Sequence, residues 1–118
     1  MKKLIDTSAL VDDLRRGVLE EGALSVITLI EVLRGVSEGK RESVKSLLEE
    51  SYAILGIDNS VVLAYCELYS ELRKRGELVP DADLLVAATA LAHGLTLVTK
   101  DRHFERLEKY GLKLELRG

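Results

Sequence analysis

Short apolar segments alternate with helical segments along this chain, and this alternation constrains the fold more than any other feature of the sequence. Apolar runs typical of strands cover residues 3–6, 23–27, 52–57, 95–99 and 112–116. Helical patterns lie between them, at residues 8–16, 28–34, 40–50, 60–75, 80–93 and 102–109. Helical crossovers between successive strands favour a mainly parallel sheet. The sequence therefore predicts an α/β fold, with ligands bound beyond the carboxyl ends of the strands where strand order reverses.

Length and composition indicate one compact unit, and we expect residues 1–118 to form a single domain. The 47% of apolar residues can build a core without metal or disulfide support. No apolar run approaches the roughly 20 residues of a membrane helix. Asp6 follows the start too closely for a signal peptide, and Cys66 is a single cysteine. These features predict a cytoplasmic protein without membrane association.

The charge balance gives little indication of the partner. The chain has 17 basic and 20 acidic residues, a net charge of −3, which does not by itself suggest nucleic-acid binding. Neither a P-loop nor a Gly-x-Gly-x-x-Gly pattern occurs, which argues against nucleotide-dependent enzymes. One Phe and no Trp give no support for an aromatic RNA-binding sheet.

Four acidic residues fall where strands meet helices. Asp6 ends the first strand, and Glu31 lies in the first turn of the helix after the second strand. Asp83 lies in the first turn of the helix before the fourth strand, and Asp101 follows that strand. If the first and fourth strands are neighbours, Asp6 and Asp101 face each other across the crevice. These positions therefore predict a site at one edge of the sheet.

Each acid also has a purely structural interpretation. Thr28 and Glu31 have the spacing of a capping box, in which each side chain satisfies a backbone N–H group at a helix start. Asp81 and Asp83 suit the first turn of a helix, and Asp101 suits an N-cap. Asp6 is harder to explain in this way, because an acid that directly ends an apolar strand is costly to desolvate unless it is paired or bound to a cation.

Converging carboxylates repel each other, and a hard divalent cation removes that repulsion. Oxygen ligands without a Cys or His pair favour Mg²⁺ or Mn²⁺ over zinc. Such an ion can activate water and offset charge on a phosphodiester. The acids therefore suggest metal-dependent phosphodiester hydrolysis.

Four segments resemble, in order, the sequence motifs of PIN domains, and they span nearly the whole chain. The segments are Leu-Ile-Asp6-Thr-Ser, Glu31-Val-Leu-Arg-Gly, Asp83-Leu-Leu-Val-Ala-Ala and Thr-Lys-Asp101-Arg-His-Phe. The short single-domain form is most similar to the VapC toxins of toxin–antitoxin pairs. The resemblance implies a three-layer α/β/α sandwich with a five-stranded parallel sheet in the order 3-2-1-4-5.

The resemblance also implies a Mg²⁺- or Mn²⁺-dependent endoribonuclease, a homodimer, and a small VapB-like antitoxin partner. The four acids Asp6, Glu31, Asp83 and Asp101 would be the catalytic and metal-binding residues, with Asp6 and Asp83 as principal ligands. Thr7, Ser8 and Thr99 would be supporting hydroxyls. We expect RNA or antitoxin contact at Arg34, Lys100 and Arg102. His103 is interpreted as a surface or partly packed residue and not as a general base.

Two alternatives remain open. A PIN-type nuclease of RNA processing or quality control would keep the fold and the site but lack an antitoxin. A non-catalytic flavodoxin-like binding module would use the acids only as helix caps. Stabilisation by millimolar Mg²⁺ or Mn²⁺ would distinguish a metal site from the binding module.

Overall fold

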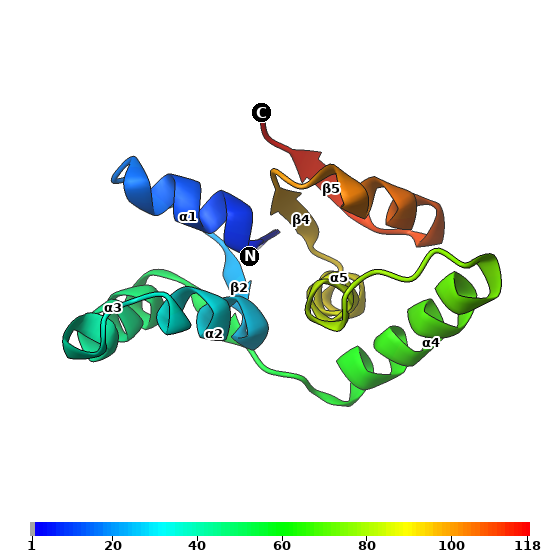
Figure 1. Cartoon of the computed structure of the whole chain (residues 1–118), viewed down its shortest axis with the longest axis horizontal. Helices are drawn as coiled ribbons and strands as arrows, with labels where there is room; N and C mark the ends of the chain where they lie inside the picture. The colour runs from blue at the N-terminus through cyan, green and yellow to red at the C-terminus, as the bar shows by residue number, and fades with distance from the viewer. Residues whose placement is uncertain (1) are drawn as a thin grey trace.

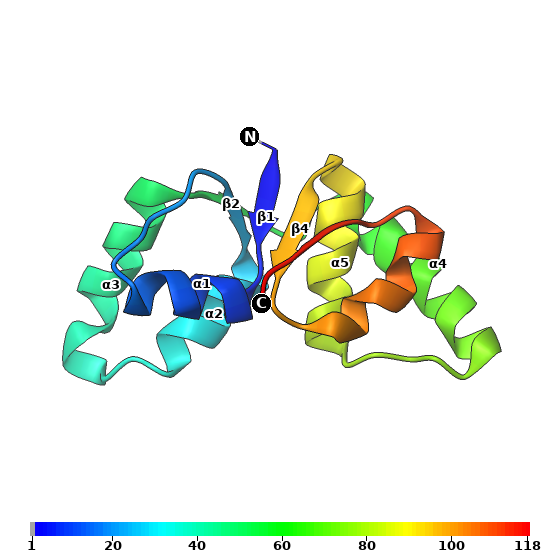
Figure 2. The same ribbon diagram turned by 90° about the horizontal axis from the view of Figure 1, so that it is seen from above.

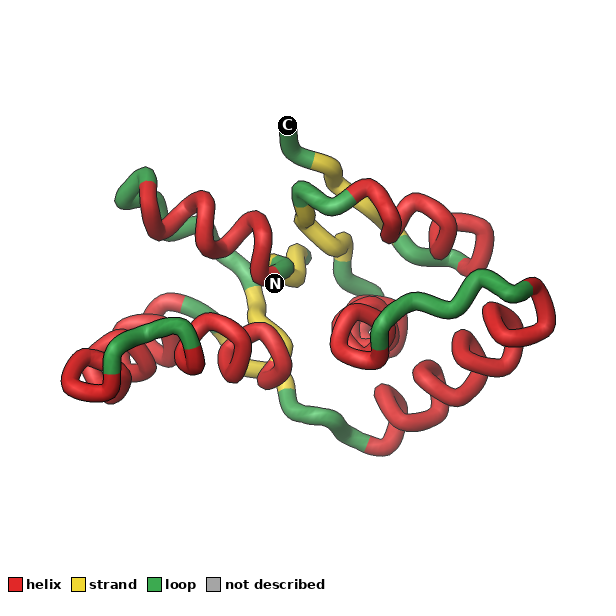
Figure 3. The backbone as a smooth tube through the Cα atoms, in the orientation of Figure 1, coloured by secondary structure: helices red, strands yellow, loops and turns green. Residues whose placement is uncertain are grey.

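Short strands and longer helices make up the protein, seen in a computed structural model that describes residues 2–118 (Figure 3). The strands are β1 (Lys3–Ile5), β2 (Ala23–Ser25), β3 (Ala53–Leu55), β4 (Thr96–Thr99) and β5 (Lys113–Leu116). The α-helices are α1 (Thr7–Arg15), α2 (Val26–Arg34), α3 (Glu38–Ser51), α4 (Asn59–Arg75) and α5 (Asp81–His93). A 3-10 helix, η1 (Arg102–Tyr110), lies between β4 and β5.

The strands form one parallel sheet in the order β3-β2-β1-β4-β5, as predicted. The chain first adds strands on one side of β1 and then returns to add β4 and β5 on the other. Helices α1, α2 and α3 lie together on one face of the sheet, and α4, α5 and η1 lie on the other (Figures 1 and 2). The predicted three-layer sandwich is therefore confirmed, with the reversal of strand order between β1 and β4.

Alternating side chains of the central strands supply two separate cores. Leu4 of β1 and Leu97 of β4 belong to the core under α4, α5 and η1. Ile5 and Val98, the next residue along each strand, belong to the core under α1, α2 and α3. All four are fully buried. Successive side chains of a strand point to opposite faces, so one short apolar strand can anchor helices on both sides.

Helix α5 is the most completely buried helix of the described chain, which its sequence explains. It lies between α4 and the sheet, and Leu84, Val86, Ala87, Ala88 and Ala90 are all fully buried. A helix that is apolar on all sides suits this central position. Because α5 is buried, its amino-terminal end is held beside the carboxyl ends of β1 and β4. Asp83 belongs to this end of the helix.

The ends of two helices confirm the expected stop signals. Gly76 after α4 and Gly94 after α5 adopt left-handed backbone conformations, with φ of 65° and 64°. The next residues, Glu77 and Leu95, donate backbone hydrogen bonds back to Leu72 and Ala90. This arrangement satisfies carbonyl groups at the helix end and favours glycine.

The start of α2 differs from the prediction. The helix begins at Val26, where the apolar run 23–27 suggested a continuing strand, and the Ser25 side chain caps it by accepting a hydrogen bond from Ile27 N. Thr28 lies inside the helix, and its buried hydroxyl has no hydrogen-bond partner. The capping-box interpretation of Thr28 and Glu31 is therefore wrong, and the Glu31 side chain is available for another role.

The described chain, residues 2–118, includes no helix whose length and apolar character would allow it to cross a membrane.

Candidate active site

The four predicted acids belong to elements that meet at the carboxyl ends of β1 and β4. Asp6 directly follows β1, and its backbone N–H donates to the Val98 carbonyl of β4 at 2.8 Å. Helices α1, α2 and α5 all begin at this edge of the sheet (Figure 2). Helix amino termini favour nearby negative charge, so the fold places acids where three helix starts attract them.

Hydroxyl groups hold the Asp6 carboxylate in place. Thr99 Oγ1 donates to Asp6 Oδ2 at 2.7 Å, and Ser8 Oγ donates to the same oxygen at 3.1 Å. Backbone N–H groups in turn hold the hydroxyls: Asp101 N donates to Thr99 Oγ1 and Lys100 N to Ser8 Oγ, each at 3.0 Å. The ends of β1 and β4 are thereby joined through one carboxylate oxygen.

Asp6 is a buried acid without a basic partner. Its side chain and backbone together are only 5% exposed. Burial raises the pKa of the Asp6 carboxyl, the nearby charge of Glu31 raises it further, and the hydrogen bonds from Thr99 and Ser8 lower it. Across residues 2–118, no Lys, Arg or His side chain forms an ion pair with Asp6. A buried carboxylate in this state is costly and is well suited to a bound cation.

Glu31 faces the start of α1 from the second half of α2, and not from the first turn of the helix as the sequence predicts, because α2 begins at Val26. Its Oε1 atom accepts a hydrogen bond of 2.7 Å from Thr7 Oγ1. Arg34, one turn further along α2, approaches Oε2 only to 3.9 Å and is largely exposed. The predicted hydroxyl Thr7 therefore orients Glu31, whereas Ser8 and Thr99 orient Asp6.

Asp83 and Asp101 are linked by a histidine that the sequence interpretation did not select. His103 Nε2 lies 3.1 Å from Asp83 Oδ2, and Nδ1 lies 2.5 Å from Asp101 Oδ1. Burial raises the pKa of the Asp83 carboxyl; His103 opposes this rise, and the charges of Asp6 and Glu31 add to it. The electrostatic influence of Asp6 and Glu31 on Asp83 connects all three acids in one site.

The acids share a site but do not form a finished metal centre. No three acidic, His or Cys side chains within residues 2–118 converge closely enough to hold a metal ion as they stand. Asp81, the other acid in the first turn of α5, instead accepts a hydrogen bond of 2.6 Å from the Tyr65 hydroxyl. This bond raises the pKa of Tyr65 to about 12. Asp81 is thus engaged with α4.

The predicted basic contacts are exposed residues at the margin of the site. Lys100 Nζ lies 3.5 Å from Asp12, and Arg102 pairs with Glu105 at 3.0 Å. His103 is the residue that sequence reasoning missed. The sequence shows that His103 lies two residues after Asp101 at a helix start. Asp83 lies 20 residues away along the chain, and only the fold brings it near His103.

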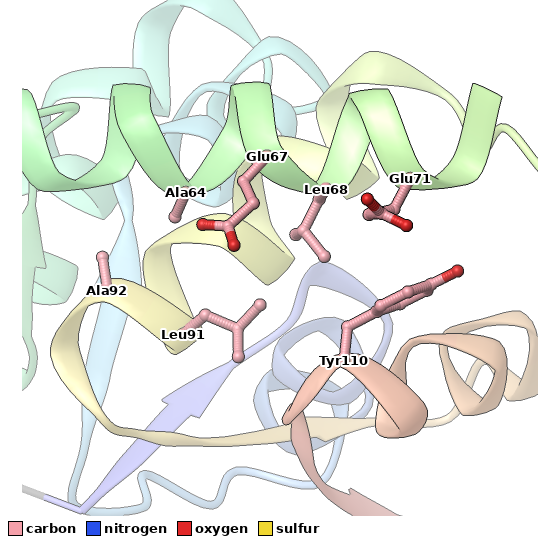
Figure 4. Close-up of a pocket in the computed structure, with 7 residues that line it drawn as sticks. All are labelled: Ala64, Glu67, Leu68, Glu71, Leu91, Ala92 and Tyr110. Carbon is pink, nitrogen blue, oxygen red and sulfur yellow. The ribbon is translucent and has the colours of Figure 1, made fainter. Parts of the chain in front are cut away.

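A separate pocket lies between α4, the carboxyl-terminal turn of α5 and the end of η1 (Figure 4). Its volume is about 290 Å³, with Ala64, Leu68 and Leu91 among its lining and Glu67 and Glu71 on the α4 side. The acids lie at the opposite, amino-terminal end of α5. This pocket is therefore distinct from the acidic site.

Comparisons with known proteins agree with the fold and the motifs. Residues 3–110 match the PIN domain family. Ribonuclease VapC1 of Methanocaldococcus jannaschii is 43% identical over 96% of this chain and 86% of its own length. Ribonuclease VapC4 of Mycobacterium tuberculosis is 37% identical over 71% of this chain and 69% of its own length. The solved structure of VapBC2 from Rickettsia felis, bound to a promoter DNA fragment, covers 100% of both chains at 25% identity with a TM-score of 0.85.

Proposed function

The chain belongs to the PIN domain family, and we propose that it cleaves RNA with the help of Mg²⁺ or Mn²⁺ as the toxin of a toxin–antitoxin pair. Endoribonuclease activity agrees with the ribonucleases to which the chain is similar. The observation that carries the metal dependence is Asp6. It is buried, it has no basic partner within residues 2–118, and the nearby charge of Glu31 raises the pKa of its carboxyl further.

The donor atoms of the site fit a hard divalent cation. Asp6 and Asp83 would be the principal ligands, Asp101 a ligand or an outer partner, and Glu31 the holder of a water molecule or a second ion. All four supply carboxylate oxygens, the donors that Mg²⁺ and Mn²⁺ prefer. Binding would draw carboxylates together that otherwise repel each other. A bound cation would stabilise negative charge on the phosphodiester and would make a water molecule more acidic.

The hydroxyl residues prepare the acids for this role. Thr99 and Ser8 both donate to Asp6 Oδ2, which fixes the orientation of its carboxylate. Thr7 does the same for Glu31 through Oε1. Hydrogen bonds of this kind around a ligand keep it in a productive orientation and strengthen metal binding.

RNA contact would come from the basic residues at the margin of the site. Arg34, Lys100 and Arg102 are exposed, and they lie close in sequence to Glu31 or Asp101. Their positive charges can pair with phosphate groups on either side of the scissile bond. Because the same residues are exposed cations, they are also suited to pair with acidic groups of an antitoxin.

The site is tested with purified protein and a structured RNA in EDTA, Mg²⁺ or Mn²⁺. We expect cleavage only with metal, and a loss of at least about 100-fold for Asp6→Asn because one ligand charge is removed. Glu49→Gln is the matched control, since Glu49 is an exposed acid of α3 paired with Lys45. Wild-type cleavage rates in Asp6→Asn would refute the assignment.

The toxin role is supported by the VapBC and FitAB complexes among the similar solved structures. We propose a small antitoxin partner, a cytoplasmic location, one domain over residues 1–118 and a homodimer. Exposed apolar side chains at the start of α4, Val62 and Leu63, give the homodimer a surface to bury. Expression of the chain alone should arrest growth, and expression of Asp6→Asn should not.

A further inference from the structure

His103 occupies the space between two of the four acids, yet the proposed reaction assigns it no role. Its two ring nitrogens face Asp83 Oδ2 and Asp101 Oδ1 at 3.1 and 2.5 Å. Asp83 belongs to the buried helix α5, whereas Asp101 belongs to the connection between β4 and η1. The imidazole therefore joins two acids that different parts of the fold supply.

The ring itself is held in one orientation. It stacks on Phe104, with ring centroids 4.6 Å apart and planes inclined by 26°. Phe104 is fully buried in the core under α4, α5 and η1. The His103 backbone N–H also donates to Asp101 Oδ1, at 3.4 Å. The core thus sets the position of the imidazole, and each ring nitrogen contacts one carboxylate oxygen.

The contact with His103 leaves one carboxylate oxygen of each acid free to bind. It uses Oδ2 of Asp83 and Oδ1 of Asp101. Within residues 2–118, the other oxygens, Asp83 Oδ1 and Asp101 Oδ2, accept no hydrogen bond from the protein. A carboxylate that is held through one oxygen can offer the other to a cation, which is how residues behind metal ligands tune binding in other sites.

We propose that His103 is a positioning residue that holds Asp83 and Asp101 in the orientation in which they receive the divalent cation. The inference rests on the proposed function, because it concerns the same site. The proposal gives the effect a direction: His103 strengthens metal binding. If the imidazole instead blocked the acids, its removal would strengthen metal binding.

The test measures Mn²⁺ binding to metal-free protein by calorimetry, for wild type, His103→Ala and His103→Gln. We expect the Kd of His103→Ala to rise by at least about tenfold, with His103→Gln recovering part of the loss because it keeps an N–H donor. In RNA cleavage, the Mn²⁺ concentration for half-maximal rate should rise in parallel. The kcat at saturating Mn²⁺ should stay within about threefold of wild type, because the ligands themselves are intact.

His93→Ala is the matched control. His93 is the other histidine of the chain, and it pairs with Asp58 at 3.0 Å at the opposite end of α5 from Asp83. Its replacement should leave the Mn²⁺ affinity unchanged. Circular dichroism of each variant verifies that it is folded, and His103→Gln keeps the test decisive if His103→Ala does not fold.

The outcomes separate the two proposals. Unchanged or tighter Mn²⁺ binding in His103→Ala overturns the positioning role, and so does a His103→Gln variant as weak as His103→Ala. Wild-type protein that binds no Mn²⁺, or Asp6→Asn that binds it as tightly as wild type, overturns the proposed function itself. Binding that depends on Asp6 but not on His103 leaves the function standing and removes only this inference.

Discussion

Asp6 is a residue whose proposed role in metal binding opposes the stability of the fold. The side chain is buried beside Glu31, and burial holds the pKa of its carboxyl above the ordinary value. The ionised form is therefore less favourable in the folded chain than in the unfolded chain. By linkage, the stability associated with Asp6 is fully present below the unfolded pKa and is lost as pH rises through the folded pKa. Near neutral pH, the ionised Asp6 side chain therefore lowers the stability of the metal-free protein.

The first prediction is that Asp6→Asn stabilises the metal-free protein while it removes activity. Asparagine has nearly the same shape, its amide oxygen can accept from Thr99 and Ser8, and it carries no charge to desolvate. We expect the Tm at pH 7 to rise by about 2–5 °C. The measurement is thermal unfolding by circular dichroism in EDTA.

Asp12→Asn is the control for this effect. Asp12 lies on α1 near Asp6, but its side chain is about one-third exposed and pairs with Arg16 and Lys100. Its replacement removes only partly exposed ion pairs and should not raise the Tm. A lower Tm for Asp6→Asn than for Asp12→Asn would contradict the electrostatic interpretation.

At the scale of the elements, local sequence signals work where backbone chemistry is decisive. Gly76 and Gly94 end α4 and α5 as the sequence predicts, because their left-handed conformations strongly favour glycine. The start of α2 was mispredicted because Val26 and Ile27 are apolar and β-branched and fit a strand equally well. Ser25 caps the helix, and this choice depends on where β2 stops pairing with β3.

The second prediction compares two glycines by their backbone conformation. Gly94→Ala places a side chain at a φ of 64° and should destabilise the protein by about 1 kcal/mol. Gly39 lies in α3, where an added Cβ meets nothing within 4 Å, so Gly39→Ala should stabilise by about 0.5–1 kcal/mol. Urea unfolding of both variants measures the difference. Equal effects would show that the conformation at residue 94 is not decisive.

At the scale of the whole molecule, an ion network ties the end of the chain to its beginning. Arg117 Nη1 donates to the buried Asp13 of α1 at 3.1 Å and pairs with Glu20 and Glu115. Lys3 of β1 also pairs with Glu20 and Glu115, at 3.3 and 3.0 Å. Asp13 is a buried charge that depends on this partner, so Arg117 contributes to the stability of the whole fold.

The third prediction is that Arg117→Met destabilises the protein by about 2 kcal/mol at pH 7, because Asp13 remains buried without its partner. The hydrogen bond from Arg117 also lowers the pKa of Glu20. Stability from a lowered carboxyl pKa is present above the unfolded pKa and is lost as pH falls through the folded value. Urea unfolding between pH 7 and 3 should therefore show a smaller acid-induced loss for Arg117→Met than for wild type.

Arg73→Met is the control, because Arg73 is an exposed residue in the last turn of α4. Its replacement should change stability by less than about 0.5 kcal/mol and leave the pH profile unchanged. An Arg117→Met variant with the wild-type pH profile would show that Glu20 does not depend on the network. The double variant of Arg117 and Asp13 then measures the coupling of that pair.

The sequence by itself determined the order of elements, the parallel sheet and the positions of Asp6, Asp83 and Asp101 at strand ends or helix starts, whereas Glu31 lies in the second half of α2. Strand and helix periods, glycine stops and motif spacing are local properties, so they can be read along the chain. Only the tertiary structure decided that Thr7 orients Glu31, that Thr99 and Ser8 hold Asp6, and that His103 joins Asp83 to Asp101. These contacts join residues up to 93 positions apart, and they form because parallel strands bring their carboxyl ends to one edge of the sheet.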